Sequence, residues 1–355
     1  MLSIPIKLPN GGYVNNLTLK KPVPVTFSKS NPIGNSDITI STEYNDCRDK
    51  LHLGLCCINT ILRGQKPAVF CSRTCIRKNF TLDSAKEKAL QNIKDISTMI
   101  HWNKANNIQC LRLSSDIFPH FTDTEIDKYT IDFALQELKA AGDLANSYGH
   151  RIVMHPGQYN QVGAKSAAVF EKTVDDLTHH ATILDAMGID KNGVLIVHGG
   201  GSYGDKESTM RRWIEQFDDL PKIVKNRLVL ENCERQYNTR DCLYMAGECK
   251  IPVVFDFHHY NCYSQIYTDY AQESFIDLSP EIIESWDDKT VLMHISEQGC
   301  GKIGHHSDYI ETLPQELFTV IRDNNIVIDL EVEAKMKEQA IFKLYNKYQG
   351  LFATV

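Results

Sequence analysis

The feature that most constrains the fold is an alternation of short apolar runs with longer amphipathic segments, which begins near residue 51. Buried parallel strands are continuous apolar runs, because helices cover both faces of their sheet. Eight such β–α units predict an α/β fold, a (β/α)8 TIM barrel, with a doubly wound open sheet as the alternative. The eight apolar runs are 51–57, 109–113, 151–154, 194–197, 228–230, 252–255, 290–293 and 326–332. The clearest amphipathic segments between them are 85–106, 123–148, 169–187 and 208–217.

Residues 1–50 differ from the rest of the chain in composition. They are rich in Pro, Asn, Ser and Thr and show weak periodicity. We therefore predict an irregular N-terminal extension over 1–50, with room for one or two short strands. The remaining residues, 51–355, are predicted to form the barrel domain.

Composition excludes several classes of protein. With 355 residues, of which 42% are hydrophobic, the chain is neither disordered nor collagen-like. The net charge of -7 argues against tight, sequence-independent coating of DNA. No apolar stretch approaches the roughly 20 residues of a membrane span. The first ten residues lack the basic head and apolar run of a signal peptide, so we expect a soluble, intracellular protein with reduced cysteines. We also expect a monomer.

Side chains with metal-binding groups stand at the ends of six consecutive apolar runs. The carboxyl ends of barrel strands open on one face, so these side chains should converge on one pocket. A lone His near a strand end is more often a core or surface residue, but six successive ends predict a multinuclear metal site. Imidazoles and carboxylates bind Zn²⁺, Mn²⁺ or Fe²⁺, and two or three ions suit phosphodiester hydrolysis. The expected ligands are His155, His198, Glu231, Asp256, His259, His294 and Glu333.

Two other motifs compete with this interpretation. Residues 199–204 match G-x-G-x-x-G, but they lie in mid-chain and no acidic strand end follows about 20 residues later, so we expect no nucleotide cofactor. A tight turn beside a metal ligand is the preferred explanation of these glycines. A group of four cysteines matches no standard metal-site spacing, and we favour free thiols over a second metal or iron-sulfur site. They are Cys56, Cys57, Cys71 and Cys75.

The stretch 50–82 contains no acidic residue and carries six basic ones. Such a stretch is usually a solvated loop, but after the first barrel strand it would lie on the rim of the pocket. There Arg63 and Arg73 are expected to contact DNA phosphates. Gln158 and Tyr159 follow His155 closely, and a polar–aromatic pair at that place can stack on bases or wedge between them. A packed loop aromatic is the alternative for Tyr159.

Seven short motifs occur in order along the chain, and as a set they are specific. The set resembles the UV damage endonuclease family over about residues 51–345. The motifs are Leu53-Gly54-Leu55-Cys56 with Asn59, Arg112-Leu113-Ser114-Ser115, His155-Pro156-Gly157-Gln158-Tyr159, Leu230-Glu231-Asn232, Asp256-Phe257-His258-His259, His306-Ser307-Asp308-Tyr309 and Glu333-Ala334-Lys335-Met336-Lys337-Glu338.

The resemblance implies an endonuclease that nicks double-stranded DNA immediately 5′ of cyclobutane dimers and 6-4 photoproducts, without ATP. It implies up to three divalent ions held by the seven residues above, with Mn²⁺ first and Zn²⁺ or Mg²⁺ as alternatives. A metal-activated hydroxide would attack phosphorus in line. The expected catalytic residues are Glu231, Glu333 and His294. The expected DNA contacts, with Arg63 and Arg73, are Gln158, Tyr159, Asn59 and His306.

The chain departs from the family's pattern at three positions. Leu292 stands where the family often has a Lys, two residues before the seventh-strand His, and Leu55 replaces a Tyr near the first strand. Asp123, with His120 close by, occupies the position of a His after the second strand. Two other functions therefore stay open: a divalent-metal sugar isomerase or epimerase on the same barrel, and a lesion-binding module that does not cleave.

Overall fold

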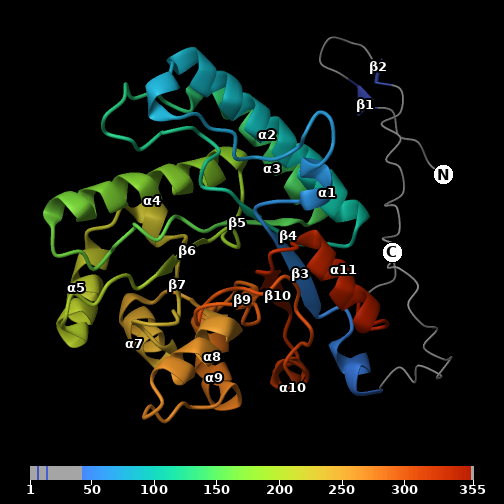
Figure 1. Cartoon of the computed structure of the whole chain (residues 1–355), viewed down its shortest axis with the longest axis vertical. Coiled ribbons are helices and arrows are strands. Elements are labelled where there is room, and N and C mark those ends of the chain that lie inside the picture. Colours follow the sequence, from blue (N-terminus) through green and yellow to red (C-terminus); the bar gives the residue numbers. More distant parts are fainter. Residues whose placement is uncertain (1–5, 8–12, 15–41, 353–355) are drawn as a thin grey trace. The chain divides into compact units, whose positions relative to one another are not determined.

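Figure 1 shows the computed structural model of the chain, which describes residues 6–7, 13–14 and 42–352. The chain divides into two compact units, Met1–Ile40 and Ser41–Val355. In the first unit, strand β1 (Ile6–Lys7) pairs antiparallel with strand β2 (Tyr13–Val14). The remainder of the predicted extension up to residue 41 lies outside the described residues.

The second unit is built on a closed barrel of eight parallel strands, in which each strand pairs with the next along the chain and the last pairs with the first. Closure places Ile328 beside Leu51. The predicted TIM barrel is confirmed, and the open-sheet alternative is wrong because the sheet has no free edge. The strands are β3 (Leu51–Cys56), β4 (Cys110–Leu113), β5 (Arg151–Met154), β6 (Leu195–His198), β7 (Leu228–Glu231), β8 (Val253–Asp256), β9 (Val291–Ile295) and β10 (Ile328–Val332).

Helices alternate with the strands and surround the barrel (Figure 1). Their apolar faces pack on the strands and form one continuous core with them. The helices are α1 (Thr60–Arg63), α2 (Leu82–Ala105), α3 (Leu135–Tyr148), α4 (Ala167–Met187), α5 (Lys206–Asp218), α6 (Lys222–Lys225), α7 (Thr239–Cys249), α8 (Phe257–Ile266), α9 (Phe275–Ser285), α10 (Gln315–Asn324) and α11 (Glu338–Lys347). Short 3-10 helices occupy Thr42–Cys47, Arg77–Asn79 and Asp132–Ala134.

One predicted helix begins later than its amphipathic pattern. The pattern starts at residue 123, but α3 begins at Leu135, after a loop and a 3-10 turn. In the loop, the Tyr129 hydroxyl donates to the carbonyl of Pro119 at 2.7 Å, and Thr130 Oγ1 donates to Asp132 at 2.8 Å. These local side-chain hydrogen bonds compete with helix formation.

Residues just before the barrel pack on its surface. The ring of Tyr44 lies 4.6 Å from the ring of Phe318 in α10, and Cys47 is buried with its thiol donating to the Phe318 carbonyl. The division into an extension over 1–50 and a barrel over 51–355 stays a prediction. Within the described part of the chain, no helix is long and apolar enough to cross a membrane.

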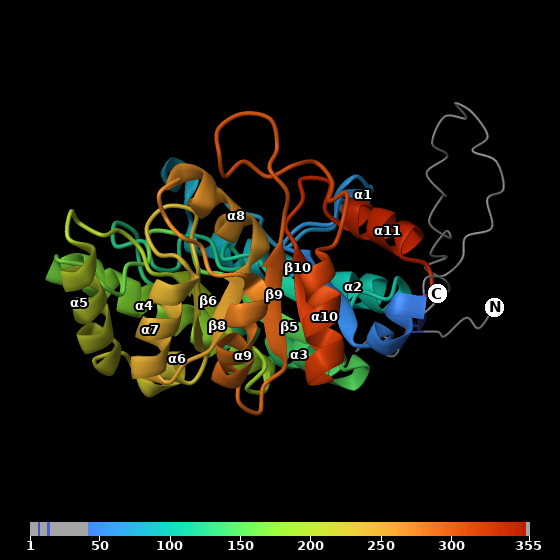
Figure 2. The same cartoon turned by 90° about the horizontal axis from the view of Figure 1, so that it is seen from below.

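The carboxyl ends of the strands all lie at one end of the barrel. Figure 2 shows this end at the top, where α8 follows β8 without a connecting loop. Asp256, the last residue of β8, caps α8 by accepting a hydrogen bond from His259 N at 2.7 Å. Strand direction therefore brings the polar strand-end residues of the sequence to one place.

Candidate metal centre

Glu231, at the end of β7, lies at the middle of the predicted ligands. One carboxylate oxygen is 2.9 Å from His155 Nε2 and 3.6 Å from His198 Nε2. The other oxygen is 3.1 Å from His294 Nδ1 and 3.3 Å from His259 Nδ1. Its side chain is 1% exposed. A single buried carboxylate therefore contacts four imidazoles, three from the ends of β5, β6 and β9 and one, His259, from the first turn of α8.

Asp256 and Glu333 complete the far side of the cluster. Asp256 Oδ2 lies 3.8 Å from both His259 Nδ1 and His294 Nδ1, and Glu333 Oε1 lies 3.5 Å from His294 Nδ1. Asp256 Oδ2 is buried and has no hydrogen-bond partner within the described part of the chain. A buried, unpaired carboxylate oxygen is costly, so this atom is suited to a cation.

The donor atoms fit divalent ions. They form three overlapping groups, in each of which all ligand atoms lie within 4.8 Å of one another. Neighbouring groups share a carboxylate residue, either Glu231 or Asp256. Imidazole nitrogen with carboxylate oxygen is a donor set for Mn²⁺ or Zn²⁺, and no thiolate is required. The three groups are His155, His198 and Glu231; Glu231, Asp256 and His259; and Asp256, His294 and Glu333.

Mutual charge sets the protonation of the cluster. Burial by itself would raise the pKa of Glu231, but the imidazoles of His198 and His294 hold that pKa well below its usual range. Burial would lower the pKa of His294, and the Glu231 carboxylate instead raises it well above its usual value. His259 is affected in the same way, chiefly by Asp256. Since a bound metal requires neutral imidazoles, loading the site would release protons.

Two further residues, the partly buried Arg112 and the buried Glu331, contact the predicted ligands, and their roles were not predicted from the sequence. Arg112, in β4, forms an ion pair with Glu333, and Glu331 Oε2 lies 2.9 Å from His294 Nε2 and 3.5 Å from Arg112 Nη1. Acidic residues at alternate positions in β10 and just after it are the signal that points to Glu331; they are Asp329, Glu331 and Glu333. Alternate residues of a strand share one face, and here that face is the barrel interior.

A family model described as UV-endonuclease UvdE matches residues 51–353. The chain belongs to the UV-endonuclease UvdE family. This confirms the resemblance drawn from the seven motifs.

The UvdE-family chain has relatives in distant organisms. It is 37% identical over 339 residues to the UV-damage endonuclease of Schizosaccharomyces pombe, a match that covers 89% of the chain and 54% of that relative. It is 35% identical over 308 residues to the putative UV-damage endonuclease of Acanthamoeba polyphaga mimivirus, covering 84% of the chain and 91% of that relative. The chain thus spans about half the length of the Schizosaccharomyces pombe protein.

Solved structures agree with the fold. The crystal structure of SacUVDE matches with a TM-score of 0.72 and 26% identity, over 84% of the UvdE-family chain and 98% of SacUVDE. Endonuclease IV from Thermus thermophilus matches with a TM-score of 0.50 and 12% identity, over 84% of this chain and 98% of that protein. The second likeness concerns the fold alone.

In the UvdE-family chain, the residues expected to contact DNA lie in different settings. Gln158 and Tyr159 are exposed in the loop that follows β5, and 62% of Tyr159 is accessible. His306 is partly buried beside the metal centre, with Nδ1 2.6 Å from the Glu333 carbonyl. Asn59 is buried, and its side-chain oxygen caps α1 by accepting from Leu62 N at 2.8 Å. The DNA contacts stay predictions, and the structure gives Asn59 a capping role as well.

The basic stretch is less cationic than its sequence suggests. Arg73 is held by the carbonyl of Ala68 and by the Asp95 carboxylate, both at 2.7 Å. Arg77 forms ion pairs with two acidic residues from a distant loop. Lys50 precedes β3 and therefore lies at the opposite end of the barrel. Arg63, by contrast, is exposed in the last turn of α1. Of the six basic residues, Arg73 and Arg77 are thus paired with acidic residues from elsewhere in the chain.

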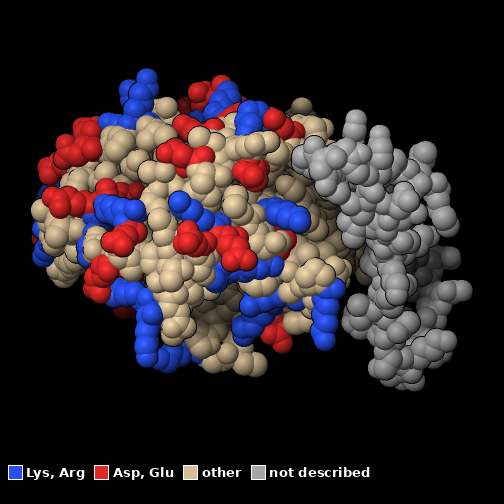
Figure 3. All heavy atoms as spheres, turned by 90° about the horizontal axis from the view of Figure 1, so that it is seen from above, with Lys and Arg blue, Asp and Glu red and all other residues tan. Residues whose placement is uncertain are grey.

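Figure 3 shows one face of the molecule, on which Lys and Arg side chains are interspersed with Asp and Glu. Although the net charge of the chain is -7, this face of the molecule is therefore not uniformly acidic.

The two other sequence motifs, the cysteine group and the glycine-rich loop 199–204, have structural explanations. All eleven cysteines are free thiols, and burial raises the pKa of Cys71 to about 12. Among the described residues, the four cysteines of 56–75 form no common group of metal ligands, although Cys56 lies in a fourth possible ligand group with Glu331 and Glu333. In the glycine-rich loop, Gly200 has a φ of +83°, the left-handed turn expected beside His198.

The residues at the three departures from the family's pattern contribute no atom to the described ligand groups. Leu55 and Leu292 are fully buried in the core. His120 Nε2 lies 2.6 Å from the carbonyl of Cys75, and His120 Nδ1 is 3.5 Å from Asp123. Neither His120 nor Asp123 belongs to the described ligand groups.

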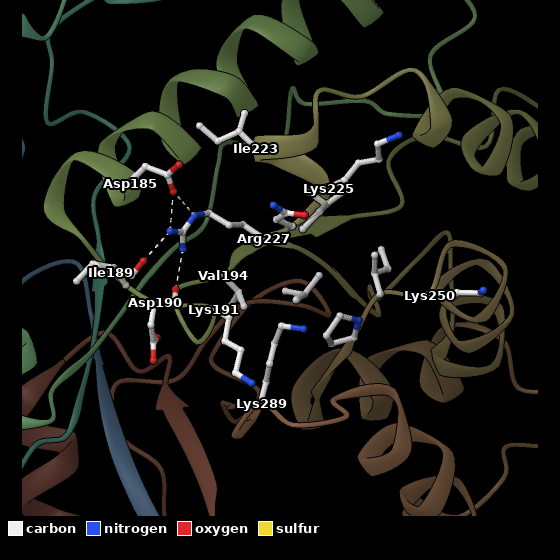
Figure 4. A pocket seen from close by; sticks show the side chains of 15 residues that line it. Asp185, Ile189, Asp190, Lys191, Val194, Ile223, Lys225, Arg227, Lys250 and Lys289 are labelled. Carbon is white, nitrogen blue, oxygen red and sulfur yellow. Dashed lines mark hydrogen bonds and ion pairs between the residues drawn. The ribbon is translucent and has the colours of Figure 1, made fainter.

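A cavity of about 550 Å³ lies at the opposite end of the barrel, near the start of β6 and β7. It is lined by five cationic residues, and at least three of them, Lys191, Lys225 and Arg227, interact with other groups of the protein. Figure 4 shows the Arg227 guanidinium turned toward Asp185 and the backbone of Ile189 and Asp190. Lys225 donates to the Asp218 carbonyl at 2.8 Å. We therefore regard this cavity as a structural feature of the barrel base.

Proposed function

We propose that this chain is a metal-dependent endodeoxyribonuclease of DNA repair. It would act inside the cell, as a monomer, on double-stranded DNA with UV lesions. It would nick immediately 5′ of cyclobutane pyrimidine dimers and 6-4 photoproducts, without ATP. Membership of the UvdE family and the names of its relatives support an endonuclease over the sugar isomerase or epimerase that the sequence left open.

The observation that carries this proposal is the contact of Glu231 with four imidazoles at the open end of the barrel. We assign the ions, up to three and with Mn²⁺ preferred to Zn²⁺ or Mg²⁺, to the three overlapping donor groups. When bound, divalent ions supply an activated water for attack on phosphorus and positive charge for the leaving 3′ oxygen.

The protein side chains have distinct tasks in this proposal. Glu231, His294 and Glu333 are the catalytic set, because they belong to overlapping groups that would hold the ions. Arg112 fixes Glu333 by an ion pair, which leaves Glu333 a defined orientation toward His294. Gln158 and Tyr159 stand exposed at the rim, where a base displaced from the duplex would meet them.

The test is a nicking assay on UV-irradiated plasmid with Mn²⁺, with a chelator as control. Glu231→Gln should reduce nicking by more than about a hundredfold and lower the bound metal, because the central bridging ligand is lost. Glu316→Gln, at an exposed position of α10, is the matched control and should leave both unchanged. Nicking at the wild-type rate by Glu231→Gln would overturn the assignment. Damage-specific binding by the wild type without any nicking would instead favour a lesion-binding module.

A further inference from the structure

Asp176, in α4, is a buried carboxylate that lies outside the metal centre and accepts hydrogen bonds from loop residues. Its exposed fraction is 3%. Oδ1 accepts from Thr122 Oγ1 at 2.9 Å and from the Tyr159 hydroxyl at 3.4 Å. Oδ2 accepts from Asn160 Nδ2 at 2.8 Å and lies 3.5 Å from His180 Nδ1. Two of these partners are consecutive residues of the loop after β5.

The same loop is anchored at further points. Asn160 Nδ2 also donates to the Gly157 carbonyl at 3.0 Å, so its amide links the turn to Asp176. One residue on, Gln161 N donates to Thr173 Oγ1, also in α4, at 2.9 Å. Helix α4 therefore holds the loop at two positions one turn apart.

Tyr159 combines an exposed ring with a tethered hydroxyl. The ring is 62% accessible, yet its edge lies so close to Gly157 that a Cβ there would be 2.5 Å from Cε1. Burial of the hydroxyl and the nearby Asp176 carboxylate both raise the pKa of Tyr159, so it stays a hydrogen-bond donor. A large aromatic side chain fixed at both ends has little rotational entropy to lose on binding.

We propose that Asp176 is a positioning residue that fixes the direction of the Tyr159 ring for recognition of the lesion. This inference rests on the proposed function, in which Tyr159 contacts the damaged duplex. Asp176 itself touches neither DNA nor metal. Its effect is preorganisation, so it should alter discrimination between damaged and undamaged DNA and leave the metal centre intact.

The test measures the affinity of the full chain for a fluorescent duplex with one photoproduct and for the same duplex without it. Tyr159→Phe and Asp176→Ala should each lower the preference for damage about three- to tenfold, the effect of one lost hydrogen bond. The double variant should lose no more preference than Asp176→Ala alone, because Asp176→Ala already removes the contact of the Tyr159 hydroxyl together with those of Thr122 and Asn160. Mn²⁺ affinity should not change.

Two reference variants make the outcomes distinct. Thr122→Val removes the other donor to Asp176 Oδ1 and should keep the preference. Tyr159→Ala should remove most of it. If Tyr159→Ala lowers the preference while Tyr159→Phe and Asp176→Ala do not, or if their losses add, the positioning role is wrong. If Tyr159→Ala has no effect, the proposed lesion contact itself is wrong. If Asp176→Ala does not fold, Tyr159→Phe still tests the positioning role, because removing a hydroxyl from the exposed Tyr159 should not unfold the protein.

Discussion

At the scale of single residues, the centre depends on what each ligand does with its second polar atom. Asp256 uses Oδ1 to cap α8 and keeps Oδ2 for the cluster. His294 directs Nδ1 toward three carboxylates, while its Nε2 lies 2.9 Å from Glu331. A carboxylate behind a metal-binding imidazole orients the ring and raises the basicity of the ligand nitrogen.

Glu331→Gln should therefore weaken Mn²⁺ binding about tenfold or more, measured by calorimetry on the purified chain. Glu338→Gln is the matched control. Glu338 is equally buried, but its carboxylate accepts from the backbone of Thr60 at 2.8 Å and Ile61 at 3.0 Å. That control should lower the free energy of unfolding and leave Mn²⁺ affinity unchanged. Equal Mn²⁺ affinities for Glu331→Gln and the wild type would contradict the orienting role.

At the scale of elements, helices α3 and α4 are in close contact at Gly142. A Cβ built on Gly142 would lie 1.7 Å from the carbonyl oxygen of Met187, the last residue of α4. The backbone of α4 therefore occupies the space that any other side chain would need. This contact helps to fix the start of the connection into β6.

Gly142→Ala should destabilise the fold by about 2 to 3 kcal/mol, because one of the two helices must move. Gly247→Ala is the control, since no atom outside its own helix lies within 4 Å of the new methyl group. It should be neutral or stabilise by up to about 1 kcal/mol, because alanine favours a helix more than glycine does. Urea unfolding monitored by circular dichroism measures both. Equal urea midpoints for Gly142→Ala and Gly247→Ala would contradict the prediction, because they would show that α3 and α4 can move apart at little cost.

At the scale of the whole molecule, buried histidines outside the centre couple folding to pH. His150 is 5% exposed, and its Nε2 lies 3.3 Å from Asn103 Nδ2. Burial lowers the pKa of His150 to about 4, and burial likewise holds the pKa of His179 well below its usual value. In the unfolded chain both groups titrate near the ordinary value, so the unfolded state binds protons first as the pH falls.

The stability contributed by a neutral His150 is thus complete above its unfolded pKa and is lost as the pH falls toward about 4. Between about pH 6.5 and about pH 4.5, the wild type should lose roughly 2 kcal/mol more than His150→Gln. Urea unfolding of the metal-free proteins at both pH values gives this difference, and other titrating groups cancel in the comparison. Parallel losses in the two proteins would refute the assignment.

Much of the fold follows from the sequence, since burial on both faces produces recognisable apolar runs. Run 151–154 coincides with β5, and run 228–230 is one residue shorter than β7. The helix predicted to begin at residue 123 is the clear error. The apolar residues there are spaced as in a helix, but they belong to a loop that packs against the core. Its anchors, such as Arg77 with Asp123, join residues that are far apart in the chain.

The sequence by itself determined which strand ends carry imidazoles and carboxylates, and parallel strand direction made their convergence predictable. Only the tertiary structure decided that Glu231 is the shared neighbour of four histidines, that Glu331 lies behind His294 and that Asp256 keeps one oxygen unpaired. It also showed that Arg73 forms an ion pair with Asp95 and that Asp176 accepts hydrogen bonds from the loop after β5. The physical reason is that periodicity records whether a residue is buried, whereas its partner depends on which distant segments the closed barrel brings into contact.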